Sequence, residues 1–248
     1  MKKQHYIITT ILLFASTVLF TGCKKDDNGP SEKGLAFHIH SLVGNQEASY
    51  GVEYTKNGRK FNLTDFRYYI SNIVLIKEDG SQYPLTNKVL LVHPSQNEYE
   101  LGNVPVGVYK GFKFMLGIDS ATNHSDPTTY PAGDPLAIQT NSIHWSWSSG
   151  YIFFKAEGYV DSTASATGPA DLEFFYHVGM DGFSRTIDFS TSAFEVTGAN
   201  DYELGITFDF LKVLNNVDMR TENATHTMDN MPLAVKVADN WQGAFELE

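Results

Sequence analysis

Cysteine is nearly absent from the chain: its 248 residues contain only one, Cys23. One cysteine cannot close an internal disulfide or supply the several thiolates of a cysteine-ligated zinc or iron site. Positive charge is also scarce: 18 Lys and Arg residues stand against 29 Asp and Glu residues, for a formal net charge of −11. An acidic surface repels nucleic acid and anionic membranes, so metal cations or neutral polar ligands are the expected partners.

Familiar catalytic patterns are missing as well. The sequence contains no G-x-S-x-G nucleophile elbow, phosphate-binding loop, dinucleotide-binding glycine motif or H-E-x-x-H zinc motif. Carboxylates are plentiful, but no spacing singles out a pair for glycoside hydrolysis. We therefore do not expect an enzyme.

The N-terminus is typical of an exported lipoprotein. Lys2 and Lys3 precede an apolar run over 6–20, which is too short to span a bilayer. Cys23 follows this run after a small residue, an order that resembles the bacterial lipobox. We expect residues 1–22 to be a signal peptide and Cys23 to carry a lipid that anchors the chain to the outer membrane. A plain secretory signal followed by a stray thiol is the alternative.

Residues 23–34 are polar and charged, without apolar periodicity, and predict a flexible tether. The charges at 24–27 resemble the signals that send lipoproteins of the Bacteroidota to the outer face of the outer membrane. A location on the cell surface is therefore expected in addition to the lipid anchor.

Residues 35–248 are long enough for one domain with a real core. Short alternating or apolar runs predict strands, and three Asn-Gly or Asp-Gly dipeptides between them predict turns. Helix signals are confined to Asp209–Asn216 and Leu233–Trp241, the second with Pro232 before it. The prediction is an all-β fold, a single mostly antiparallel β-sandwich with one or two short helices near the C-terminus. The expected strands are Leu35–Val43, Phe66–Ile76, Val89–Val92, Val108–Leu116, Ile143–Ala156, Leu172–Val178, Thr186–Phe189 and Leu204–Phe210.

The segment Ser142–Gly158 is the most distinctive part of the chain. It holds two of the three tryptophans, Trp145 and Trp147, beside His144, within the expected strand Ile143–Ala156. Side chains two apart share a strand face, so the two indoles would stand together while His144 points away. The pair predicts a functional site, although large aromatic side chains at these positions could equally form sandwich core.

Histidines are the other candidate residues. His38 and His40 lie two apart in the run FHIHSLVG, so their imidazoles would share one strand face and could reach one ion. Without thiolates, imidazole suits copper, zinc or nickel, and the affinity order favours copper. Such a pair could also be an ordinary polar surface. His177 ends the apolar run EFFYHVG, where a buried structural role is an equal alternative, and His124 lies in the turn-rich segment TNHSDP.

Five segments follow one another from Leu35 to about Val178: FHIHSLVG, FRYYISNIVLIKEDG, VPVGVYKGFKFMLGIDSATNHSDP, DPLAIQTNSIHWSWSSGYIFFKAEG and EFFYHVG. Their most specific parts are W-x-W-x-x-G-Y at 145–151, N-H-x-D at 123–126 and H-x-G at 177–179. In this order they resemble the MbnP-like copper-binding proteins, including the lipoprotein branch of the Bacteroidota.

The resemblance implies a copper-binding protein of the cell envelope with a mononuclear histidine site and a role in copper acquisition or handling. It also implies that a tryptophan is oxidised to kynurenine by a partner dihaem enzyme of the MauG type. Trp145 or Trp147 would then be the modified residue. The candidate copper ligands are His38, His40, His177 and His124.

Two other functions fit the same composition. A surface carbohydrate-binding or adhesive lipoprotein is supported by the 13% aromatic content, the acidic charge and the expected anchor. A surface structural subunit without a small ligand is also compatible with the chain. Sugar binding requires exposed aromatic rings on a concave patch, whereas copper binding requires convergent imidazoles.

Overall fold

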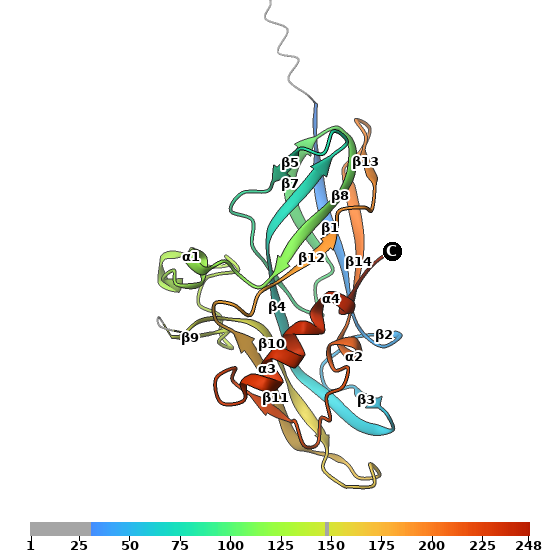
Figure 1. Ribbon diagram of the computed structural model, residues 1–248, viewed down its shortest axis with the longest axis vertical. Helices are drawn as coiled ribbons and strands as arrows, with labels where there is room; N and C mark the ends of the chain where they lie inside the picture. Colours follow the sequence, from blue (N-terminus) through green and yellow to red (C-terminus); the bar gives the residue numbers. More distant parts are fainter. Residues whose placement is uncertain (1–30, 147–148) are drawn as a thin grey trace, which may run out of the picture.

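The computed structural model describes residues 31–146 and 149–248, which form two β-sheets joined by a common core, with four short α-helices (Figure 1). The expected all-β, mostly antiparallel sandwich is confirmed. The signal peptide, Cys23 and Trp147 lie outside the described residues. Within those residues, no helix is both long and apolar enough to cross a bilayer.

The smaller sheet has five strands and the larger sheet eleven. The smaller sheet contains β1 (Glu32–Val43), β2 (Gln46–Glu47), β7 (Glu98–Pro105), β14 (Tyr202–Asp209) and β16 (Phe245–Leu247). The larger sheet contains β3 (Glu53–Lys56), β4 (Arg59–Lys77), β5 (Gln82–Pro84), β6 (Leu90–Val92), β8 (Gly107–Leu116), β9 (His144–Ser146), β10 (Gly150–Asp161), β11 (Ala170–Gly179), β12 (Arg185–Phe189), β13 (Phe194–Val196) and β15 (Ala224–Thr225). The helices are α1 (Ser120–Asn123), α2 (Phe210–Val213), α3 (Met231–Asp239) and α4 (Trp241–Ala244), with a 3-10 turn over Pro127–Thr129.

Strand β1 alternates between the core and the outer surface. Leu35, Phe37 and Ile39 are buried, whereas His38 and His40, at the alternate positions, are partly exposed. The alternation follows from the period of two along a strand with one buried face. It fixes both histidines on the outer face of the smaller sheet.

Strand β4 is 19 residues long and joins the two halves of the larger sheet (Figure 1). Its first part pairs with β10, from Phe61 to Tyr68, and its second part pairs with β8, from Ile70 to Lys77. The register with β8 shifts after Ser71, where Asn72 takes a left-handed φ of 50°. Asparagine tolerates this conformation, and the bulge bends the strand.

Aromatic side chains join the two sheets. The ring of Phe37 on β1 lies 5.5 Å from Phe112 on β8. Phe208 on β14 stacks on Tyr68 of β4 at 4.5 Å and meets the ring of Phe245 edge-on at the same distance. These large apolar surfaces supply most of the driving force that holds the sandwich together.

The tryptophan-rich run differs from its expected form. We predicted one strand over Ile143–Ala156, but β9 ends at Ser146 and β10 begins at Gly150, so the run forms a hairpin. Gly150 has a left-handed φ of 73°, and a Cβ at this position would lie 2.2 Å from the Asn123 amide oxygen. Glycine is needed there for both reasons.

The two expected helices are present in shortened form. The one predicted over Asp209–Asn216 is α2, capped by the Asp209 carboxylate, which accepts a hydrogen bond from the Leu211 amide. The one predicted over Leu233–Trp241 corresponds to α3, and Pro232 lies in its first turn as expected. The parallel pairing of β1 with β14 had no signal in the sequence.

Substitution Phe208→Ala should lower the free energy of unfolding by about 3–5 kcal/mol, because it leaves a cavity between the two sheets. Tyr159→Ala, at a side chain that is 41% exposed, is the control and should cost less than about 1 kcal/mol. Denaturant unfolding followed by tryptophan fluorescence measures both. Equal losses in the two variants would contradict the assignment of Phe208 to the core.

Candidate metal site

The two histidines of β1 converge on each other. His38 Nε2 and His40 Nε2 lie 3.1 Å apart, and the ring centroids are 4.8 Å apart. Two nitrogens bound at about 2.0–2.1 Å to one ion lie roughly 2.9–3.4 Å apart for angles between square and tetrahedral. The observed separation therefore already suits a shared metal ion.

His40 is held by a carboxylate on its other nitrogen. His40 Nδ1 is hydrogen-bonded to Glu47 on β2. If Nδ1 donates its proton to this carboxylate, Nε2 keeps a lone pair directed at His38 and a potential metal. Glu248 Oε1 lies 3.6 Å from the same Nε2.

Carboxylates from the neighbouring strands approach His38. Glu98 on β7 is the register partner of His38, and Glu203 lies on β14. His38, Glu98 and Glu203 each offer one ligand atom, and these three atoms lie within 4.8 Å of one another. We call His38, His40, Glu98 and Glu203 the β1 site.

Two further details are consistent with a binding role for the β1 site. His38 Nδ1 is enclosed by protein and has no hydrogen-bond partner, an arrangement that costs free energy. Gly205, which pairs with His38 on β14, leaves room for the Glu248 side chain, because a Cβ there would lie 2.7 Å from Glu248 Oε2. The absence of a side chain at Gly205 therefore lets the Glu248 carboxylate lie against β14.

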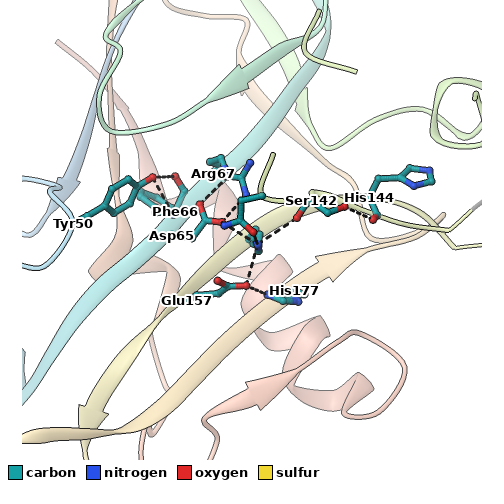
Figure 2. Close-up of polar contacts among 10 residues, drawn as sticks. Tyr50, Asp65, Phe66, Arg67, Ser142, His144, Glu157 and His177 are labelled. Carbon is teal, nitrogen blue, oxygen red and sulfur yellow. Dashed lines mark hydrogen bonds and ion pairs between the residues drawn. The ribbon is translucent and has the colours of Figure 1, made fainter. Parts of the chain in front are cut away.

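His177 belongs to a different polar network, on the outer face of the larger sheet (Figure 2). His177 Nε2 lies 2.8 Å from Glu157 Oε1, and Lys155 Nζ lies 3.0 Å from the same oxygen. The hydrogen bond from His177 and the nearby Lys155 hold the pKa of Glu157 at about 2, well below its ordinary value, although partial burial acts in the opposite direction.

Lys155 is the centre of this network and is only 3% exposed. Its ammonium also lies 2.9 Å from Asp65 Oδ2, and Arg67 makes two hydrogen bonds to the carboxylate of Asp65. Lys155 further donates to the carbonyl of Ser142 and to the side chain of Asn141. The network therefore connects the sheet to the segment that leads into β9.

Trp145 is half-buried at the margin of the core. Its indole lies over Gly179, because a Cβ at 179 would be 3.1 Å from the ring. Asn123 is fully buried and its amide oxygen accepts a hydrogen bond from the Tyr151 amide, which joins α1 to the hairpin. Asn123, Trp145, Tyr151 and Gly179, which come from three of the sequence motifs, therefore lie together, and we call these four residues the tryptophan corner.

The remaining histidines have their own partners. His124 Nε2 lies 3.2 Å from Asp181 at the tryptophan corner. His144 packs edge-on against Tyr151, and burial lowers the pKa of its imidazole. His226 has its ring 4.9 Å from that of His177, and its Nδ1 is hydrogen-bonded to Asp229.

Of the four histidines predicted as ligands, the structure brings together His38 and His40. Both point outward from the smaller sheet, whereas His177 points outward from the larger sheet, so the core lies between them. Sequence reasoning missed Glu98 and Glu203, because strand register is not readable from one sequence. The alternation of the exposed Glu98 with the buried Tyr99 indicates a strand with Glu98 on its outer face, and this was the one local signal in the sequence.

Comparison with known proteins identifies the family. The model of the MbnP family matches residues 32–230, most of the chain, so the chain belongs to the MbnP family. MbnP from Methylosinus trichosporium has a similar solved structure, with a TM-score of 0.56 and 17% sequence identity over 77% of this chain and 80% of that chain. At this identity the similarity shows the shared fold alone. Curated proteins gave no significant match.

Substitution Glu157→Gln should lower the free energy of unfolding at neutral pH by about 1–2 kcal/mol, because Lys155 and His177 lose a charged partner. The folded-state pKa of Glu157 is depressed, so its stabilisation is present above 4.5 and is lost as the pH falls towards about 2. The difference between wild type and variant should shrink over that interval. Denaturant unfolding across this pH range measures it, with exposed Glu195→Gln as control. A pH-independent difference would contradict the assignment.

Proposed function

We propose that this protein binds copper in the cell envelope and acts in copper acquisition or handling. The observation that carries the proposal is the 3.1 Å separation of His38 Nε2 and His40 Nε2 on the outer face of β1. Two convergent imidazoles form a site that suits copper, and the affinity order places copper above other divalent ions. Membership in the MbnP family supports the same metal.

Oxidation of a tryptophan to kynurenine by a MauG-type dihaem enzyme is part of the proposal. Trp145 is supported by its position at the tryptophan corner, where its ring is held against Gly179 but keeps part of its surface accessible. Trp147, the other candidate, lies outside the described residues. The protein would then be the substrate of an enzyme rather than an enzyme itself.

The location in the envelope rests on the N-terminal sequence. Lipidation of Cys23 would anchor the chain to the outer membrane. The expected tether over 23–34 would be shorter than predicted, because β1 begins at Glu32, and the polar residues before β1 would hold the domain away from the lipid surface. The acidic net charge suits a protein that binds cations.

The double variant His38→Ala/His40→Ala should bind copper at least about tenfold more weakly than wild type, because it removes both convergent nitrogens. The matched control is His93→Ala/His226→Ala. His93 Nδ1 is hydrogen-bonded to Ser95 and His226 Nδ1 to Asp229, so this variant removes two histidines outside the β1 site. Equilibrium dialysis followed by metal analysis measures the bound copper. Unchanged affinity in the His38→Ala/His40→Ala variant would remove these residues from the copper site.

Protein purified from its native host should show the mass gain of one kynurenine, located by peptide mass spectrometry to Trp145 or Trp147. Recombinant protein made without a dihaem enzyme should show the mass of unmodified tryptophan and serves as the control. Unmodified tryptophans in the native protein would contradict the proposed modification and leave copper binding to be judged by the histidine variants.

A further inference from the structure

A pocket of about 430 Å³ lies at the end of the larger sheet where β3 turns into β4 (Figure 1). Three turns line it: the β3–β4 turn, the β10–β11 loop and the loop between α2 and β15. Each turn contributes one residue with a left-handed φ, namely Asn57, Ala166 and Asn216. The volume lies within the range of about 300–1,000 Å³ that is typical of small-molecule sites. We call it the hairpin pocket.

Three cationic side chains join these turns to one another. Lys56 Nζ donates to the Val217 carbonyl in the α2–β15 loop at 3.0 Å. Arg59 Nη1 donates to two carbonyls, one at the end of β10 and one in the loop that follows. Arg220 Nε, in the α2–β15 loop, donates to the Ser162 carbonyl in the β10–β11 loop at 2.9 Å. Because a carbonyl is a neutral acceptor, these contacts leave the positive charges without a counter-charge.

Lys56 and Arg59 are also direct cross-strand neighbours. They are register partners on either side of the β3–β4 turn, so their side chains share one face of the hairpin. Like charges directly opposite each other destabilise a strand pair. Among the described residues, Lys56 and Arg220 form no ion pair, and Arg59 has one long contact, 3.9 Å from Nη1 to Asp161 Oδ1.

The carboxylates near the hairpin pocket do not neutralise these cations. Asp218 lines the pocket, and Glu222 nearby is already paired with Lys236. Partial burial lowers the pKa of Lys56, whereas Asp218 and Glu222 act in the opposite direction. An anion placed beside the Lys56 ammonium would offset this cost of burial.

We propose that the hairpin pocket binds a small oxyanion, either free or carried on an acidic sugar, and that Lys56 and Arg59 contact its negative charge. Ammonium and guanidinium groups form charge-assisted hydrogen bonds with carboxylate, sulfate and phosphate. One oxyanion between the two side chains relieves their repulsion.

The amides of Asn57 and Asn216, which line the same pocket, can serve the hydroxyl groups of a sugar. The net charge of the chain favours cations or neutral ligands, but the hairpin pocket is a local exception, because three cations gather around it. This site is independent of the proposed copper function.

The test titrates the full chain at low ionic strength with sodium glucuronate, sodium sulfate and glucose, followed by calorimetry and by the backbone amide resonances. Glucose has the same kind of ring as glucuronate without its charge. We expect both anions to bind, glucose to bind at least about tenfold more weakly, and added sodium chloride to weaken the binding of both anions. The amide resonances of Asn57, Ala166 and Asn216 should shift with either anion.

Variants assign the charge. Lys56→Gln/Arg59→Gln should weaken anion binding by about tenfold or more, because both cations are lost. The control Lys77→Gln/Lys110→Gln removes the same charge at the opposite end of β4 and on β8, and should bind as wild type does. Asp218→Asn should tighten anion binding by about threefold, since a repelling carboxylate is removed. A misfolded variant cannot produce such a gain.

Binding of sulfate without glucuronate would identify a free oxyanion as the ligand, and tighter binding of glucuronate would identify an acidic sugar; both results support the hairpin pocket. Three results would overturn it: no amide shifts with either anion, equal affinity for glucose and glucuronate, or unchanged affinity in Lys56→Gln/Arg59→Gln. Copper binding should be the same in all these variants, so failure of this proposal leaves the copper proposal untouched.

Discussion

The position of β1 between β14 and β7 is the constraint on which the rest of the β1 site depends. Parallel pairing with β14 and antiparallel pairing with β7 place His38 opposite Gly205 and Glu98. Burial of Phe37 and Ile39 then decides which face the histidines take. A slip of one residue would put imidazoles into the core and aromatic rings into solvent, so the energy of core packing also fixes the geometry of the ligands.

The two polar regions of the molecule differ in how their charge is balanced. On the larger sheet, Lys155 and Arg67 neutralise Asp65 and Glu157 within a nearly buried network. On the smaller sheet, Glu98 and Glu203 lie near His38 and Glu248 lies near His40, and none of these glutamates forms an ion pair with a lysine or arginine of the described residues. The first arrangement is complete in itself and serves to position a loop, whereas the second gains most from a cation supplied from outside.

Much of the fold could be predicted from the sequence, because apolar alternation and turn dipeptides are local signals. The H-x-H pair was found for the same reason. The roles of Glu98 and Glu203 depend on strand pairing between distant segments, which no local pattern encodes. The break in the tryptophan run was missed because it depends on the close approach of Asn123 to Gly150, a contact between separate parts of the chain.

The network around Lys155 has a consequence for how this protein can change during evolution. Removing Asp65 or Glu157 alone would leave a buried ammonium short of a partner, while removing Lys155 alone would leave carboxylates facing each other across the strands. Replacement of all of them by apolar residues of similar volume can be nearly neutral. We therefore expect the residues at positions 65, 155 and 157 to be substituted together in related proteins. Variants that have lost only one of the three charges should be selected against.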